Sequence, residues 1–219
     1  APQTAYYWPN FISEEEEALL LEKIYASPKP RWTQLNHRRL QNWGGHPHQN
    51  GMIPEDIPHA SILSLGWLFQ YCNRVKETGI FENRDPNHVL INEYLPGQGI
   101  MAHLDGPTFW PVVATLNLGS HTMLDFYHPI PDASTTQVED RYLGSLLLES
   151  RSLSVLCHDF YSKYLHGIKE TISDPVKGEN VIWNLSRTQA LEGECLQRRT
   201  RISLTIRHVP KVLKTRLRL

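Results

Sequence analysis

The second half of the chain consists of short β-forming runs separated by turn signals, and this pattern constrains the fold more than any other feature. Turn-forming pairs such as Pro96-Gly97, Gly119-Ser120 and Asp174-Pro175 interrupt the runs. Short strands at this spacing are typical of antiparallel sandwiches and barrels. We therefore expect a mainly β fold with flanking helices, with strands at residues 88–94, 112–118, 122–126, 144–148, 152–156 and 202–209.

Two helices are expected before these strands. Ser13 and Glu16 have the spacing of a capping box, in which each side chain accepts a hydrogen bond from the backbone of the other residue. Apolar residues follow at helical spacing as far as Ile24, and Pro28 ends the segment. A second helix is expected at residues 60–77, where apolar residues again recur near helical spacing.

Length and composition indicate a single domain. The chain has 219 residues, of which 40% are hydrophobic, and this is enough apolar mass for one core. Residues 1–87 are expected to carry the N-terminal helices, with a strand or hairpin leading into a surface loop within residues 31–51. Residues 88–219 are expected to form the β core, with an irregular polar insertion at about 169–200.

Charge and cysteine content exclude several classes of protein. The 22 Lys and Arg residues nearly balance the 23 Asp and Glu residues, so the chain as a whole is not an electrostatic nucleic-acid binder. The three cysteines contain no CxxC pair, which argues against a zinc framework or a disulfide scaffold and favours a reducing, intracellular compartment. Every apolar run is far shorter than the roughly 20 residues that span a bilayer, so no membrane association is expected.

One histidine–carboxylate motif is a candidate for metal binding. His103-Leu104-Asp105 is the only HxD or HxE triplet in the chain. In an extended segment residues i and i+2 point to the same side, so His103 and Asp105 could face one metal ion. Two histidines and one carboxylate form a facial triad on Fe(II) that leaves coordination positions open. His166, 63 residues later, is the candidate for the second histidine, and His158 is the alternative.

The last expected strand alternates polar and aliphatic residues with period two. One face of this strand therefore carries four polar side chains, namely Arg201, Ser203, Thr205 and Arg207. One interpretation is an ordinary half-exposed strand. The other is an inward polar face on which two guanidinium groups hold a dicarboxylate. Asn92 and Tyr94 likewise share one face of their strand, and their side chains are neutral hydrogen-bond partners for such a pocket.

In order and spacing, these motifs together resemble the AlkB family of Fe(II)- and 2-oxoglutarate-dependent dioxygenases. The resemblance runs from Asn92-x-Tyr94 through His103-x-Asp105 and His166 to the motif Arg201-x-Ser203-x-Thr205-x-Arg207. It implies a double-stranded β-helix, also called a jelly roll, as the core of the fold. It also implies that the protein uses Fe(II), 2-oxoglutarate and O2.

The resemblance further implies roles for individual residues. His103, Asp105 and His166 would bind Fe(II) and form the catalytic centre. Arg201 would pair with the distal carboxylate of 2-oxoglutarate, and Arg207 would lie near the carboxylate beside the keto group. The remaining cosubstrate contacts would come from Asn92, Tyr94, Ser203 and Thr205, where the family commonly has Asn in place of Ser203.

Substrate contacts are expected where AlkB-like proteins carry their nucleotide-recognition lid, before the barrel. A single-stranded or flipped base is typically clamped between aromatic faces and arginines. The candidates are Arg38, Arg39, Gln41 and Trp43, with Phe109, Trp110 and Tyr127 as further candidates.

The function implied by the resemblance is oxidative demethylation of alkylated nucleobases in DNA or RNA, by hydrogen abstraction. An alternative is a dioxygenase that hydroxylates or demethylates a protein or another non-nucleic-acid substrate. A binding module without turnover is a third hypothesis, and the complete set of ligands and arginines argues against it. We expect a monomer in the cytoplasm and nucleus, with nucleic acid as its partner.

Overall fold

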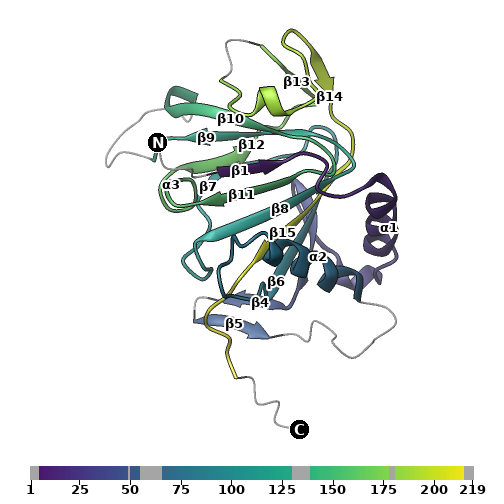
Figure 1. Cartoon of the computed structure of the whole chain (residues 1–219), viewed down its shortest axis with the longest axis vertical. Helices are drawn as coiled ribbons and strands as arrows, with labels where there is room; N and C mark the ends of the chain where they lie inside the picture. The colour runs from purple at the N-terminus through teal and green to yellow at the C-terminus, as the bar shows by residue number, and fades with distance from the viewer. Residues whose placement is uncertain (1–4, 49, 55–65, 130–138, 178–180, 215–219) are drawn as a thin grey trace.

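Two β-sheets packed face to face form the centre of the molecule (Figure 1). The structure is a computed structural model that describes residues 5–48, 50–54, 66–129, 139–177 and 181–214. The larger sheet has seven strands in the order β1 (Ala5–Trp8), β11 (Leu153–Cys157), β8 (Val112–Leu118), β15 (Arg201–Arg207), β6 (His88–Tyr94), β3 (Arg38–Trp43) and β2 (Thr33–Leu35). The smaller sheet has four, in the order β10 (Tyr142–Leu148), β9 (Thr122–Tyr127), β12 (Leu165–Ile168) and β7 (Ile100–His103).

The expected mainly β architecture is therefore confirmed, and the strand boundaries lie close to the expected ones. The strands β6 and β8 have the expected limits, whereas β15 begins at Arg201 and ends at Arg207 rather than extending to residue 209. All pairings within the two main sheets are antiparallel. The strand that carries the polar motif, β15, lies between β8 and β6 and is thus central in the larger sheet.

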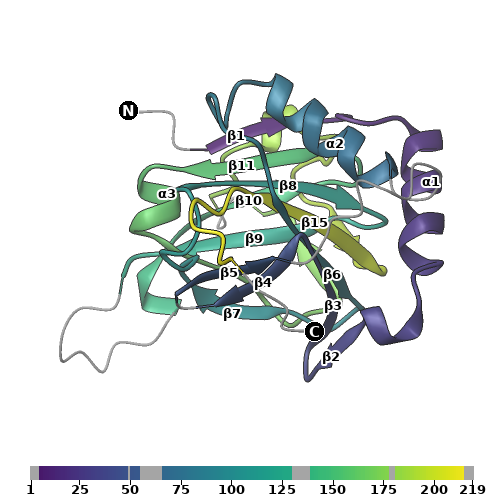
Figure 2. The same cartoon turned by 90° about the horizontal axis from the view of Figure 1, so that it is seen from below.

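Two helices pack against the outer face of the larger sheet (Figure 2). The first, α1 (Glu14–Tyr25), starts with the expected capping box: Glu16 N donates to Ser13 Oγ at 3.2 Å, and Ser13 N donates to Glu16 Oε2 at 2.8 Å. The second, α2 (Gly66–Glu77), covers most of the expected segment, and residues 60–65 lie outside the described residues. Among the described residues, no helix is long and apolar enough to cross a membrane.

The apolar residues form two separate cores. The outer core lies between the larger sheet and the two helices, and it contains the aliphatic residues of β15, Ile202, Leu204 and Ile206. The inner core lies between the two sheets and contains Phe126 of β9 and Tyr94 of β6. Because side chains alternate along a strand, the polar residues of β15 face the inner core and the space between the sheets.

The region expected to contain a hairpin holds two. The first joins β2 to β3, and the second joins β4 (Gly45–His48) to β5 (Gly51–Pro54). Gly45 has a φ of +151°, and a Cβ there would lie 2.4 Å from the Ile53 carbonyl oxygen. Glycine thus permits the close approach of the two strands of the second hairpin.

The stretch expected to be an irregular insertion carries short elements. A two-stranded sheet joins β13 (Ser173–Pro175) to β14 (Cys195–Gln197), and a 3-10 turn spans Leu185–Arg187. Arg198 donates two hydrogen bonds to the Asp174 carboxylate, each of 2.6 Å, and both side chains are buried. A short helix, α3 (Asp159–Ser162), connects β11 to β12.

Candidate metal centre and anion site

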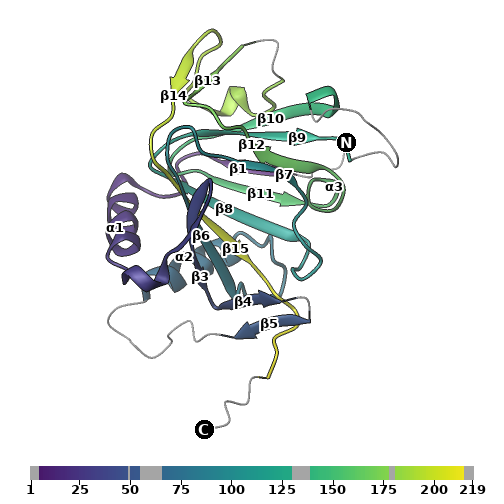
Figure 3. The same cartoon turned by 180° about the vertical axis from the view of Figure 1, so that it is seen from behind.

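His103 and His166 lie opposite each other on neighbouring strands of the smaller sheet. They are register partners across β7 and β12, which run side by side in Figure 3. Their ring centroids are 4.6 Å apart. His166 is also the register partner of Phe126 in the inner core, so its side chain points into the space between the sheets. The structure thus places His166, and not the alternative His158, beside His103.

Asp105 completes the group from the segment that follows β7. Its Oδ2 lies 3.8 Å from His166 Nε2, and its side chain is 6% exposed. Its other carboxylate oxygen, Oδ1, accepts a hydrogen bond of 2.6 Å from Arg207 Nη2. The three side chains that the HxD motif and the distant histidine predicted therefore meet in space.

The histidines are in states suited to metal binding. His103 Nδ1 lies 2.8 Å from the Met101 carbonyl oxygen, which can only accept, so Nδ1 carries the proton and Nε2 keeps its lone pair. Burial lowers the pKa of His166 to about 4, an effect that nearby Asp105 partly offsets. His166 is therefore neutral at pH 7.

The chemistry of the three side chains fits Fe(II). Among the residues that the structure describes, no three His, Cys, Asp or Glu side chains are arranged as a finished metal site. Asp105 is turned onto Arg207. Within the described part of the chain, the buried Nδ1 of His166 has no hydrogen-bond partner. Two neutral imidazoles and one carboxylate are the ligands of a non-haem Fe(II) centre.

Arg201 is a buried cation with unused hydrogen-bond donors. Its Nη2 donates to Asn117 Oδ1 at 2.6 Å, whereas its buried Nε and Nη1 have no partner among the described residues. Burial lowers its pKa to about 10, so the guanidinium is still charged at pH 7. A buried charge without a counterion is costly. The geometry therefore suits an anionic ligand at this end of β15.

Arg207 offers a second unused donor at the other end of the strand. Its buried Nε has no hydrogen-bond partner in the part of the chain that the structure describes, while its Nη2 donates to Asp105. The ring of Phe109 lies 4.4 Å from its guanidinium. Because the two arginines share one face of β15, the pair suits a ligand with two carboxylates, and 2-oxoglutarate has this chemistry.

The other predicted cosubstrate residues lie on the same inner face. All seven residues of β15 are buried, which contradicts the interpretation of this strand as half-exposed. In register, Ser203 lies between Asn92 of β6 and Asn117 of β8, and Thr205 follows it on the same face. Arg38 Nε donates to Asn92 Oδ1 at 3.1 Å. The ring of Tyr94 lies 5.5 Å from the Arg201 guanidinium.

Sequence reasoning missed two residues at this site. Asn117 is completely buried and accepts the hydrogen bond from Arg201; the period-two pattern of its strand was the available signal. His88 is also completely buried, and its ring centroid is 5.7 Å from that of Phe109. Nothing in the local sequence distinguishes His88 from a surface histidine, because only the pairing of β6 with β15 brings it opposite Arg207.

Three of the four candidate substrate contacts on β3 lie on the face of the strand that points away from the candidate site. Gln41 is completely buried and Trp43 is 5% exposed, with Trp43 Nε1 donating to Gln41 Oε1. Trp43 packs edge-on against Trp67 of α2, within the outer core. Arg39 lies on the same outward face, where its guanidinium binds both oxygens of Glu93. The physical reason is alternation: these residues point away from the inner face on which Arg38 lies.

Two of the three further candidates for substrate contact, Trp110 and Tyr127, also lie away from the site. Trp110 packs against the outer core, and the Arg84 guanidinium lies 3.4 Å from its ring centre. Tyr127 is a register partner of Leu165, so it points to the outer face of the smaller sheet, where it lines a groove of about 680 Å³. Phe109 is the aromatic candidate that does lie at the site, beside Arg207.

Comparisons with known proteins agree with this geometry. Residues 4–207 match the family model described as the 2OG-Fe(II) oxygenase superfamily. A protein of Danio rerio named "Probable RNA/DNA demethylase ALKBH6" is 50% identical over 221 residues, which cover 99% of this chain and 90% of that protein. The "tRNA (carboxymethyluridine(34)-5-O)-methyltransferase ALKBH8" of Macaca fascicularis is 32% identical, over 69% of this chain and 24% of that protein.

Solved structures share the fold at low sequence identity. The structure of OsALKBH1 matches with a TM-score of 0.56 and 13% identity, covering 95% of this chain and 99% of that one. A prolyl-4-hydroxylase of Pseudomonas putida matches with a TM-score of 0.53 and 12% identity, covering 94% of each chain. The expected double-stranded β-helix is thereby confirmed.

Proposed function

Because this chain belongs to the 2OG-Fe(II) oxygenase superfamily and is an oxidoreductase of that class, we propose that it oxidatively removes alkyl groups from nucleobases of DNA or RNA. The family as a whole uses Fe(II), 2-oxoglutarate and O2. The assignment of particular residues to these groups, and of nucleic acid as substrate, is our proposal.

The observation that carries the proposal is the pair of buried arginines with unused donors beside the His–Asp–His group. His103, Asp105 and His166 would hold Fe(II), which with 2-oxoglutarate and O2 supplies the oxidation of a C–H bond. Arg201 would bind the distal carboxylate of 2-oxoglutarate through Nε and Nη1, which have no hydrogen-bond partner among the described residues. Arg207 would hold Asp105 in position and offer its Nε to the other carboxylate.

The surrounding residues orient the cosubstrate and exclude water. Asn92, Ser203 and Thr205 are buried polar side chains on the inner face, where they offer further hydrogen bonds. Tyr94 is buried, and burial raises the pKa of its hydroxyl, so it stays protonated and able to donate. The inner core, with Phe126 and Ile168, closes the space between the sheets behind His166. A dry site of this kind protects reactive chemistry from side reactions.

Nucleic acid is favoured as substrate by sequence similarity rather than by the fold. The Danio rerio relative, at 50% identity, is named as a probable RNA/DNA demethylase. The fold alone does not choose a substrate, since a prolyl-4-hydroxylase shares it. Two of the candidate substrate contacts lie at the inner face: Arg38 contacts Asn92, and Phe109 contacts Arg207. A location in the cytoplasm and nucleus accords with this substrate class and is likewise proposed.

The test is to incubate the protein with iron, ascorbate, 2-oxoglutarate and separate pools of methylated DNA, RNA and peptides, followed by mass spectrometry of each pool. We expect methyl groups to be lost from a nucleic-acid pool, with formaldehyde as coproduct, and no loss with the His103→Ala variant. Modification of the peptide pool alone would overturn the nucleic-acid proposal in favour of a protein substrate.

A further inference from the structure

A row of aromatic rings leads from the candidate metal centre to the surface beside α3. The ring centroid of Phe126 lies 6.4 Å from that of His166 and 4.6 Å from that of Phe160. The row then divides. Phe160 contacts Trp183 at 5.3 Å on one side and Tyr164 at 5.5 Å on the other.

We refer to the outer members of this row as the ring strip, which consists of His128, Tyr164, Phe160 and Trp183. The centroid of His128 lies 5.9 Å from that of Tyr164, so neighbouring rings of the strip are 5.3 to 5.9 Å apart. His128 is exposed, and Tyr164 and Phe160 are half-buried. Every ring of the strip is therefore at least partly accessible to solvent.

Trp183 is held at the surface by the backbone beneath it. A Cβ at Gly144 of β10 would lie 2.4 Å from the Trp183 ring, so the indole packs directly on this glycine. Trp183 nevertheless remains 41% exposed. Together with the neighbouring rings it forms a contiguous aromatic patch, and such patches are typical of binding surfaces.

The strip borders a groove at one edge of the β-sandwich. Phe160 and Trp183 line a groove of about 540 Å³ together with Tyr6 and Trp8 of β1. The rings of Tyr6 and Trp8 stack at 5.7 Å with an interplanar angle of 20°. β1 and β10 are the end strands of the larger and the smaller sheet, and residues 181–184 hydrogen-bond along the outer edge of β10. The groove therefore lies between β1 and this segment.

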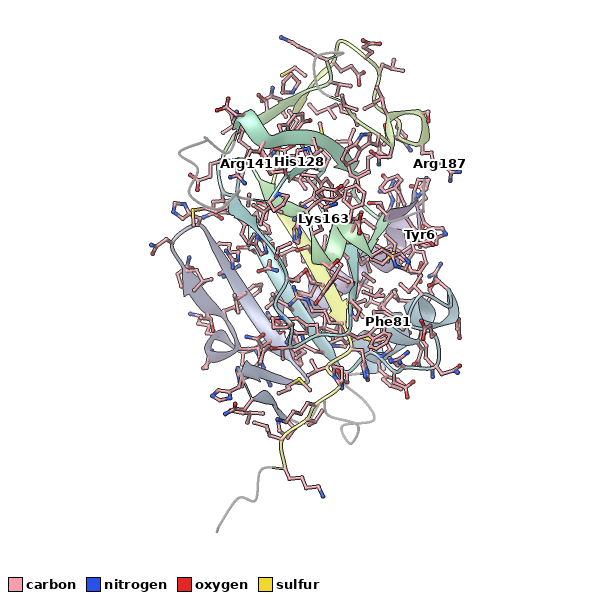
Figure 4. All side chains as sticks on the ribbon, turned by 90° about the vertical axis from the view of Figure 1, so that its left-hand side faces the viewer. Tyr6, Phe81, His128, Arg141, Lys163 and Arg187 are labelled. Carbon is pink, nitrogen blue, oxygen red and sulfur yellow. The ribbon has the colours of Figure 1, made fainter. Side chains whose placement is uncertain are left out.

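Two cations accompany the rings. Arg187 lines the groove, and Lys163 Nζ lies 5.3 Å from the Tyr164 ring centre. Figure 4 shows Lys163 near the centre of this side of the molecule, with His128 on one flank and Arg187 on the other. Both cations are exposed, and among the described residues neither has a carboxylate within ion-pair distance.

Two acidic residues, Glu149 and Asp159, lie near this surface. Glu149 contacts the groove residue Tyr7, whose hydroxyl donates to Glu149 Oε2 at 3.1 Å. Its other oxygen accepts from the Gln189 amide at 2.8 Å. Asp159 is exposed on α3. The surface thus combines π faces with two exposed cations that form no ion pair within the described part of the chain.

We propose that the ring strip and the adjoining groove bind the single-stranded nucleic acid that flanks the target base. This inference rests on the proposed function. Bases stack on aromatic rings whatever their sequence, and cations beside the rings neutralise the phosphates. A duplex hides its base faces within its own stack, so a single strand is the form that suits a row of rings. The contact of Phe160 with Phe126, and of Phe126 with His166, connects this surface to the catalytic centre.

The test measures binding of the full chain to fluorescein-labelled oligo-uridine and oligo-thymidine of 15 nucleotides, and to a duplex, by fluorescence anisotropy. We expect Trp183→Ala to raise the Kd for single strands about tenfold, since stacking is worth on the order of 1–3 kcal/mol per base. Trp183→Phe should retain most of the affinity. Arg187→Gln should weaken binding about threefold. It should also reduce the slope of log K against log salt concentration by about 1, which corresponds to the loss of one phosphate contact.

The matched control is Arg199→Gln, because Arg199 is an exposed arginine without a carboxylate partner in the described residues and lies outside the strip and groove. It should bind as the wild type does. Because Trp183 packs against other rings, Trp183→Ala is compared with Arg187→Gln, which changes an exposed side chain.

The outcomes separate the two proposals. Wild-type affinity in both Trp183→Ala and Arg187→Gln, with nucleic acid still demethylated, would overturn the ring strip as a binding surface and leave the proposed function intact. Tighter binding of duplex than of single strands would also overturn it. Absence of binding to every oligonucleotide, with peptides modified instead, would overturn both.

Discussion

Arg207 holds Asp105 through a hydrogen bond of 2.6 Å from Nη2 to Oδ1, across 102 residues of sequence. This contact fastens the carboxylate of the candidate metal group to the central strand of the larger sheet. We expect Arg207→Gln to weaken binding of Co(II) or Mn(II) by about 10- to 100-fold, as loss of a partner that orients a ligand does. Isothermal titration calorimetry measures this, and unchanged affinity would contradict the positioning role.

Removal of any of the three candidate ligands should abolish turnover of 2-oxoglutarate. For His103→Ala, Asp105→Ala and His166→Ala we expect succinate formation to fall by at least about 100-fold, because each variant loses a direct ligand of the metal. His158→Ala is the matched control, since His158 is exposed and was the alternative ligand. Full succinate formation by a triad variant, or loss of activity in the control, would refute the assignment.

Arg201→Gln should separate cosubstrate binding from folding. Loss of a charge-assisted contact is worth about 1.5–3 kcal/mol, so we expect the KM for 2-oxoglutarate to rise about 10- to 100-fold. The same variant should be at least as stable as the wild type without cosubstrate, because it removes a buried charge that forms no ion pair with any residue the structure describes. Thermal unfolding with and without 2-oxoglutarate tests both effects, and an unchanged KM would exclude the distal-carboxylate role.

His88 should make folding stability sensitive to mild acid. Burial, followed by the charges of Arg207 and His46, lowers its pKa from 6.5 to about 3. The unfolded state therefore binds a proton between these values and the folded state does not, so stability is lost as pH falls below about 6.5. Between pH 7 and pH 5 this costs about 2 kcal/mol. Urea unfolding at both pH values measures the free energy of unfolding. We expect it to fall more between pH 7 and pH 5 in the wild type than in His88→Gln, and an equal fall in both proteins would disprove the role of His88.

Trp43 should behave as a core residue and not as a substrate contact. It is 5% exposed and packs against Trp67, so Trp43→Ala should lower the free energy of unfolding by about 3–5 kcal/mol. Leu35→Ala, at an exposed position of β2, should change it by about 0.5 kcal/mol or less. Chemical denaturation checks the comparison. A wild-type stability for Trp43→Ala would restore the surface role.

The elements that sequence predicted well are those with local causes. The capping box of Ser13 and Glu16 satisfies backbone groups within one turn, so the start of α1 follows from four consecutive residues. The alternation in β15 likewise needs no partner to be recognised. The HxD motif and the distant His166 were recognised as one group because their order along the chain resembles that of a known family.

The errors concern which side of a strand is buried. Both faces of β3 carry polar and aromatic residues, and flanking glycines at Gly44 and Gly45 favoured an exposed Trp43. The face that packs under α1 and α2 is instead the one with Gln41 and Trp43. Trp43 Nε1 donates a hydrogen bond to Gln41 Oε1, so both polar groups can be buried together. Alternation defines two faces, but only the packing of the helices decides which of them is the interior.

The sequence by itself determined the class of fold, the positions of most strands and the set of residues available for metal and anion binding, because periodicity, capping and motif spacing are local properties. Only the tertiary structure decided how these residues meet. It set Arg207 against Asp105, placed Asn117 as a hydrogen-bond acceptor for Arg201, and brought Trp183 and Arg187 beside a groove at the sheet edges. The physical reason is that such contacts depend on the register between strands far apart in the chain, which long-range packing fixes and no local pattern encodes.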